Sequence, residues 1–239
     1  MLVAAYLRKR RFFPLPVLLF CVVSAIIGKS CVFDAAAALP TGEGGVLIVD
    51  PGHGGLDGGA STASGVTEST INLEIAEKLA FLARFFGVET VMTRTAEELD
   101  YPDEAGTVRQ KKAWDQKQRI ALIGGTENAV LISIHQNKFP DARPRGTLAL
   151  YAKTEGSKEL GEITHAMLIE NLNPENRRVA APISESIYLM RSVNCPAVLV
   201  ECGFLSNPEE AALLCDGGYQ IKLAAVLLAS YAAFAEGFK

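Results

Sequence analysis

The sequence of 239 residues is short of several features that mark common classes of protein. It has no Gly-x-Ser-x-Gly segment, which argues against the nucleophilic serine of an α/β-hydrolase. It has no Cys-x-x-Cys spacing, which argues against a structural zinc site built from thiolates. No internal repeat appears, and no linker rich in proline or serine divides residues 45–239. We therefore expect one compact unit over that range.

Beyond the N-terminal stretch, basic residues are fewer than acidic ones. Residues 1–38 hold five basic residues and one acidic residue, so the rest of the chain has 18 basic and 26 acidic residues and a net charge of −8. Nucleic acid binding needs a basic face, which this balance does not favour. We therefore expect no nucleic-acid partner, and we expect the negative charge to keep the domain soluble.

The N-terminal stretch differs from the rest of the chain. Four consecutive basic residues at 8–11 precede an uncharged, mostly apolar segment at 12–27. This order is typical of a secretion signal, and the segment is shorter than the ~20 residues that span a bilayer comfortably. A cleaved signal peptide is favoured over a retained signal-anchor that attaches to the membrane through residues 12–27, and an N-terminal core helix is third. The first two interpretations place residues 45–239 on the extracytoplasmic side, behind a leader and short linker at 1–44.

Strand and helix signals alternate from residue 45 onward. Apolar runs predict strands at 46–50, 88–93, 129–134, 147–151, 187–190 and 197–201. Helical spacing and capping residues predict helices at 68–86, 107–123 and 157–172, a short helix from 208, and a last helix at 219–234. This alternation is typical of crossover units. We therefore predict an α/β fold of three layers, with a twisted, mainly parallel sheet of about six strands and helices on both faces.

Two of the three histidines directly follow apolar runs. The run VLIV leads into the segment DPGHGG, which carries His53, and the run AVLI leads into SIHQN, which carries His135. Ligands gather at the carboxyl ends of strands in open α/β sheets. A single histidine after a strand is usually a surface or hydrogen-bonded residue, but two in similar loops favour a metal site. Two imidazoles and a carboxylate, with one position left open, form a common catalytic zinc shell.

The carboxylate of such a shell should lie near His53. Asp57 lies in a glycine-rich loop, where an aspartate most often makes a turn. Glu68 begins a predicted helix, where a rigid element can direct its side chain, although the helix dipole alone favours an acid at that position. The residue types leave both candidates open.

Glu201 ends the apolar run 197–200 and should therefore lie at the rim of the sheet. Burial there would raise its pKa and suit it to accept a proton from a water molecule. The alternative is a structural carboxylate held by loop amides or by an arginine such as Arg191. Spacing alone does not decide between them.

These motifs together resemble those of the zinc-dependent N-acetylmuramoyl-L-alanine amidases, the type-3 amidase family. The segments that carry the resemblance are VDPGHGG at 49–55, Glu68 with INL at 71–73, SIHQN at 133–137 and VECGFLSN at 200–207. Each would be weak alone, but they occur in order over most of residues 45–239. The resemblance implies that His53, Glu68 and His135 bind Zn²⁺ and that Glu201 is the catalytic acid and base of a zinc amidase domain.

The resemblance also implies a substrate and a reaction. The expected reaction is hydrolysis of the amide between the lactyl group of N-acetylmuramic acid and L-alanine in peptidoglycan, and an activating protein partner is compatible with it. The compact layout is similar to the amidases of spore-cortex maturation, which act with a deacetylase to form muramic lactam. Gln136 and Cys202 depart from the family's usual small residues, which bears on fine specificity. The rival functions are a zinc exopeptidase or deacetylase with a similar shell, and a catalytically silent cell-wall-binding protein.

We expect the remaining histidine, a pair of arginines and two cysteines to have structural roles. His165 lies in the middle of a predicted helix and is expected to be a solvent-side or packing residue. Arg177 and Arg178 are expected to form a solvated loop more readily than a substrate clamp. Cys195 and Cys202 flank a strand-like segment, so we expect them to be buried as small apolar residues.

Overall fold

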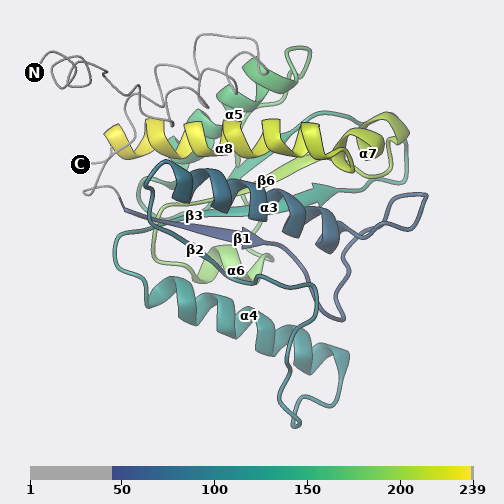
Figure 1. The fold of residues 1–239 in the computed structure, drawn as a ribbon, viewed down its shortest axis with the longest axis vertical. Helices are drawn as coiled ribbons and strands as arrows, with labels where there is room; N and C mark the ends of the chain where they lie inside the picture. The colour runs from purple at the N-terminus through teal and green to yellow at the C-terminus, as the bar shows by residue number, and fades with distance from the viewer. Residues whose placement is uncertain (1–44, 238–239) are drawn as a thin grey trace, which may run out of the picture.

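Six strands form one sheet in the computed structural model, which describes residues 45–237 (Figure 1). They are β1 (Val46–Pro51), β2 (Thr90–Met92), β3 (Ala129–Asn137), β4 (Leu148–Tyr151), β5 (Ala181–Pro182) and β6 (Ala197–Phe204). The spatial order is β2-β1-β3-β6-β4-β5. β2, β1, β3 and β6 run parallel, whereas β4 is antiparallel to β6 and is followed by β5 in parallel. The prediction of a mainly parallel sheet of about six strands is confirmed.

Helices cover both faces of this sheet (Figure 1). One face carries α3 (Glu68–Phe85), α5 (Ser157–Leu172) and α8 (Gly217–Gly237), and the other carries α4 (Val108–Gly124) and α6 (Tyr188–Ser192). The short helix α7 (Pro208–Leu214) follows β6. The central strands β1, β3 and β6 therefore bury both of their faces, which explains why their sequences read as continuous apolar runs.

The helix α8 is apolar on nearly all sides. Among the described residues it alone has the length and hydropathy of a membrane-crossing helix. Most of it is buried, however, because α3 and α5 pack against it and its side chains join the larger core cluster. A helix that is hydrophobic all round is buried in this way in a globular core.

One strand prediction is wrong. Residues 187–190 belong mostly to the helix α6, and the sixth strand is the two-residue β5 at the edge of the sheet. The backbone N–H of Arg191 donates to the carbonyl of Ile187, which closes a helical turn. Short apolar runs fit a strand or a helix equally well by periodicity, and the proline at the end of β5 suits an edge strand.

The last helix also begins earlier than predicted. Gly217 and Gly218, which precede the helix predicted at 219–234, are the first residues of α8. The carboxylate of Asp216 accepts a hydrogen bond from the backbone N–H of Tyr219 and so caps this helix. Cys195 and Cys202 are buried, as predicted, and both are free thiols, as is the exposed Cys215.

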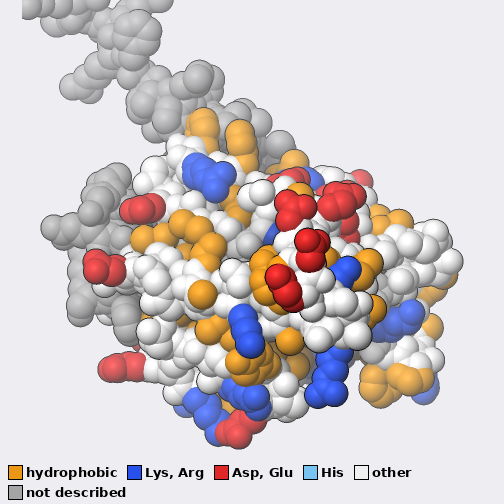
Figure 2. Space-filling view, turned by 90° about the horizontal axis from the view of Figure 1, so that it is seen from below, with side chains coloured by type: hydrophobic (Ala, Val, Ile, Leu, Met, Phe, Trp, Pro, Cys, Tyr) orange, Lys and Arg blue, Asp and Glu red, His pale blue; other side chains and the backbone are white. Residues whose placement is uncertain are grey.

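The surface on the α4 side carries charges of both signs. Figure 2 shows Lys and Arg side chains scattered over this face, with no continuous basic stripe. The leader and the membrane attachment predicted for residues 12–27 lie outside the described residues.

Candidate metal centre

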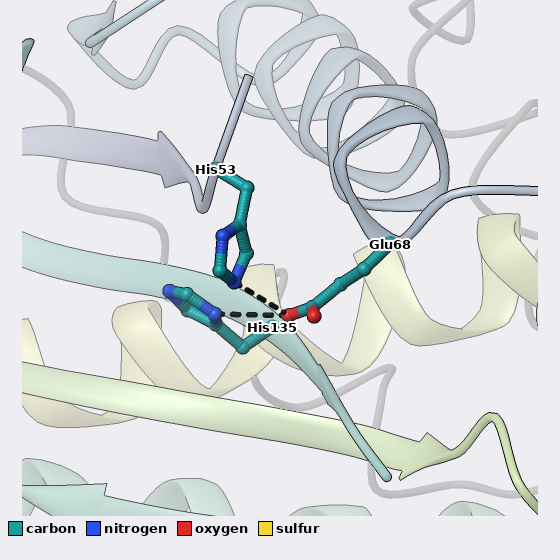
Figure 3. A group of neighbouring side chains, drawn as sticks. All are labelled: His53, Glu68 and His135. Carbon is teal, nitrogen blue, oxygen red and sulfur yellow. Dashed lines mark hydrogen bonds and ion pairs between the residues drawn. The ribbon is translucent and has the colours of Figure 1, made fainter. Parts of the chain in front are cut away.

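His53, Glu68 and His135 converge at the carboxyl edge of the sheet (Figure 3). His53 follows β1, Glu68 is the first residue of α3, and His135 lies near the end of β3. Glu68 Oε1 is 3.3 Å from His53 Nε2 and 3.0 Å from His135 Nδ1. One donor atom from each side chain lies within 4.8 Å of the other two. The structure thus brings together the three residues that the family resemblance implies as ligands of one ion.

Backbone amides fix the carboxylate of Glu68. Its Oε2 accepts the N–H of Ala60 at 2.9 Å, and its Oε1 accepts the N–H of Gln136 at 3.0 Å. Burial raises the pKa of Glu68, but hydrogen bonds and the charges of both histidines outweigh this effect and lower the pKa below its usual value. The carboxylate is therefore ionised and held in one direction.

A second carboxylate orients His53 from the outer side. Asp57 Oδ2 lies 3.1 Å from His53 Nδ1, and Lys112 Nζ lies 2.9 Å from Asp57 Oδ1. Burial lowers the pKa of His53, but its contacts with Asp57 and Glu68 dominate and raise the pKa to about 9. A carboxylate on one imidazole nitrogen fixes the tautomer and leaves the other nitrogen as a donor to a metal. Asp57, the other candidate for the shared carboxylate, thus lies on the outer nitrogen of His53 and not between the two histidines.

The loop between β1 and α3 needs glycine at two positions, where its backbone comes close to the side chains of His135 and Glu68. A Cβ at Gly52 would overlap the imidazole of His135. A Cβ at Gly59 would lie 2.6 Å from Glu68 Oε2, and the backbone there has a φ of +66°, which favours glycine. His53 itself has a φ of +61°. The loop therefore holds an unusual backbone conformation directly at the site.

Arg119 of α4 anchors the segment that presents His53. Its side chain is buried and donates to Asp50 Oδ1 at 2.8 Å, to the Pro51 carbonyl at 2.8 Å and to the His53 carbonyl at 2.6 Å. Asp50 is buried too and also accepts a hydrogen bond from Ser133. This ion pair ties the end of β1 to α4.

Arg94 also holds the segment that precedes His53, through hydrogen bonds to backbone carbonyls. Its guanidinium donates to the carbonyls of Pro51 at 3.0 Å, Gly52 at 3.1 Å and Ser69 at 2.8 Å. It therefore joins the loop before His53 to the first turn of α3. Sequence reasoning missed both arginines. For Arg119 the available signal was its position four residues before the buried Ile123 on α4. Nothing in the sequence around Arg94 distinguishes it.

Glu201 lies beside this cluster on β6. It is the register partner of His135, so the two side chains project from the same face of neighbouring strands. Glu201 Oε2 is buried and has no hydrogen-bond partner among the described residues. Burial raises the pKa of Glu201 to about 7. Arg191 is not its partner, because the Arg191 guanidinium lies over the ring of Tyr188.

A carboxyl group with this pKa can both accept and return a proton near neutral pH. The cluster and Glu201 together therefore have the chemistry of a metal-dependent hydrolase. His165 lies elsewhere: it is buried against β4, where its Nδ1 accepts the N–H of Ala149. The prediction that it is a packing residue is confirmed, and the solvent-side alternative is wrong.

The model of the N-acetylmuramoyl-L-alanine amidase family matches residues 47–230. The chain belongs to this family. The germination-specific N-acetylmuramoyl-L-alanine amidase of Bacillus subtilis is 36% identical over 183 residues, which is 76% of each chain. This amidase therefore hydrolyses the amide between N-acetylmuramic acid and L-alanine, and its substrate is peptidoglycan.

Solved structures of amidases have the same fold. The CwlD amidase from Clostridioides difficile, solved in complex with the GerS lipoprotein, superposes with a TM-score of 0.77 at 34% identity, covering 81% of this chain and 99% of that chain. An N-acetylmuramoyl-L-alanine amidase from Clostridium difficile 630 superposes with a TM-score of 0.70 at 26% identity, covering 82% and 99%. The three-layer α/β architecture is thus shared with these enzymes.

Proposed function

We propose that His53, Glu68 and His135 hold a zinc ion in this amidase and that Glu201 is its catalytic acid and base. The observation that carries the proposal is the convergence of one oxygen and two nitrogen donors within 4.8 Å of one another at the strand ends. Two imidazoles and a carboxylate suit zinc by ligand type. The buried oxygen of Glu201, which has no partner among residues 45–237, supplies a fourth polar group beside them.

In the proposed reaction, zinc would activate the attacking water, and residues of the protein would transfer the proton and hold the metal ligands in position. Zinc in such a shell acts as a Lewis acid that makes water a nucleophile at neutral pH. Glu201 accepts the proton of the attacking water and returns it to the nitrogen of the departing L-alanine, because an unprotonated amine would re-form the bond. Asp57 keeps the outer nitrogen of His53 protonated, and Arg119 and Arg94 hold the backbone of its loop in place.

The setting of the reaction is inferred from the relatives. We propose that this amidase acts on spore-cortex peptidoglycan, in muramic lactam formation, because a relative of similar length is named germination-specific. We also propose that it works with a protein partner, because a solved relative forms a complex with a lipoprotein. Residues 1–44 would export the domain or anchor it through residues 12–27, which places it outside the cytoplasm, where cell-wall amidases act.

Metal analysis combined with product analysis tests these roles. We expect Glu201→Gln to keep stoichiometric zinc and to lose turnover by ~10²- to 10⁴-fold, as loss of a general acid–base group does. His53→Ala and His135→Ala should lose the zinc itself. Full zinc occupancy in both histidine variants would reject the ligand set, and an active Glu201→Gln enzyme would reject its role. Mass spectrometry should show a freed stem-peptide amine, whereas released acetate or a single amino acid would indicate a deacetylase or an exopeptidase.

A further inference from the structure

A cavity of about 540 Å³ lies outside the candidate metal centre and shares no lining residue with it. Its lining consists of residues 172–178 together with Arg145 and Gly146. This volume lies within the range of ~300–1,000 Å³ that is usual for ligand pockets. Three of the lining residues are arginines, Arg145, Arg177 and Arg178, and we call the cavity the arginine pocket. The mechanism above does not use it.

The arginine pocket lies on the same rim of the sheet as Glu201. β4 runs antiparallel to β6 and Leu148 pairs with Glu201, so the residues just before β4 lie at the carboxyl end of β6. The guanidinium of Arg178 stacks 5.0 Å from the ring centre of Phe204, the last residue of β6. Phe204 is three residues beyond Glu201, which corresponds to ~10 Å along a strand.

The walls of the pocket are held by buried polar contacts. Ala149 N–H donates to Nδ1 of the buried His165 at 3.3 Å, which leaves Nε2–H of that imidazole to donate to the Arg178 carbonyl at 3.0 Å. The amide of Asn176 donates to the Thr147 carbonyl at 2.7 Å and accepts the N–H of Arg178 at 3.1 Å. The loop after α5 is therefore fixed onto β4 before any ligand arrives.

The charges of the pocket are only partly neutralised. Arg145 lies 3.7 Å from Glu209, and Arg177 lies 3.8 Å from Glu175, and all four side chains are exposed. Such exposed ion pairs are weak and exchange readily with other anions. The Arg178 guanidinium donates to the backbone carbonyl of Arg145, and within the described residues no carboxylate lies within ion-pair distance of it. The lining thus holds three positive charges against the single negative charge of Glu175.

We propose that the arginine pocket binds a free carboxylate of the stem peptide whose amide is hydrolysed at Glu201, with Arg178 as the main specificity residue. The inference rests on the proposed function. An extended peptide covers ~3.5 Å per residue, so the ~10 Å along β6 between Phe204 and Glu201 corresponds to about three residues of the stem. A guanidinium presents paired N–H donors that match a carboxylate. The buried carboxylate beneath the pocket, Glu210, does not compete for Arg178, because it accepts the backbone N–H groups of Gly146 and Phe204.

Kinetics with matched substrates test this assignment. The probes are a muramyl tripeptide with free carboxylates and the same tripeptide with every carboxylate amidated, hydrolysed by the full chain loaded with zinc. We expect the wild type to prefer the free form. Arg178→Gln should lower kcat/KM about tenfold on the free form, the size of one hydrogen bond to a charged group, and leave the amidated form unchanged. Arg177→Gln, which removes no contact to the sheet, should reduce the same preference to a smaller extent.

The matched control is Arg84→Gln, which removes an equal charge from the opposite end of α3 and should change neither rate. If the wild type and both pocket variants had the same ratio of kcat/KM on the free and the amidated tripeptide, the inference would be overturned. The pocket would then bind a different anion, such as an acidic protein surface. An equal loss on both substrates in Arg178→Gln would overturn it as well, because the role would then be structural. If the wild type freed no stem-peptide amine from either substrate, the proposed function itself would fail, and this result differs from the others.

Discussion

Replacing Glu201 by Gln in the metal-free protein should increase the free energy of unfolding at neutral pH. In the folded state the Oε2 atom of Glu201 is buried and finds no hydrogen-bond partner within residues 45–237, and burial raises the pKa of the carboxyl group from its ordinary value of 4.5 to about 7. The neutral form is therefore favoured by folding. The stability that Glu201 contributes is fully present below pH 4.5 and is lost as the pH rises through 7. Glutamine keeps the shape of the neutral acid at every pH.

The expected size follows from this change in pKa. One pKa unit corresponds to about 1.4 kcal/mol, so the rise from 4.5 to about 7 corresponds to roughly 3 kcal/mol. Because the Glu201 side chain is only partly shielded from water, we expect about 2 kcal/mol at pH 8. For a domain of this size such a difference raises Tm by about 4–8 °C.

Thermal and urea unfolding in the presence of a chelator, at steps from pH 4.5 to pH 8, measure this effect. The two proteins should be almost equally stable at pH 4.5 and should diverge as the pH rises. Glu77→Gln, on the exposed side of α3, is the control that removes the same charge from the surface. A difference between wild type and Glu201→Gln that does not change with pH, or a glutamine variant that is the less stable at pH 8, would refute the reasoning.

Three further changes test how the candidate metal centre is supported. Arg119→Leu should cost about 3–5 kcal/mol of stability in urea unfolding, because it leaves the buried carboxylate at the end of β1 unpaired; an unchanged midpoint would contradict this. Asp57→Asn should weaken zinc binding about 10- to 100-fold in a competition assay with a chelator, because His53 loses the charge on its outer nitrogen; unchanged affinity would show that this carboxylate does not act through the ligand. Gly52→Ala should abolish zinc uptake while retaining the far-UV circular dichroism of the fold, because its methyl group would occupy the place of the His135 ring; full metal content would count against the close approach.

Local sequence patterns were sufficient for most of the fold. The helix predicted at 157–172 has the observed bounds of α5, because its apolar spacing and the Asn-Pro that follows it are local signals. The strand predicted at 187–190 failed because four apolar residues do not distinguish a strand from one turn of helix. The early start of α8 was missed because it depends on a side-chain contact. Asp216 precedes α8 and accepts the backbone N–H of Tyr219, and this cap places both glycines in the first turn of the helix.

What the sequence by itself determined is the identity of the groups that carry the chemistry. Two histidines and Glu201 follow or end apolar runs, and parallel strands place their carboxyl ends on one rim whatever the details of packing. Residue types left Glu68 and Asp57 open and the family resemblance implied Glu68; the tertiary structure places Glu68 between both histidines and Asp57 on the outer nitrogen of His53. It alone also showed that Glu201 keeps an oxygen without a partner in the described part of the chain, and that two buried arginines hold the loop that presents His53. These features depend on distances between atoms that lie tens of residues apart in the chain, and local patterns carry no information about such distances.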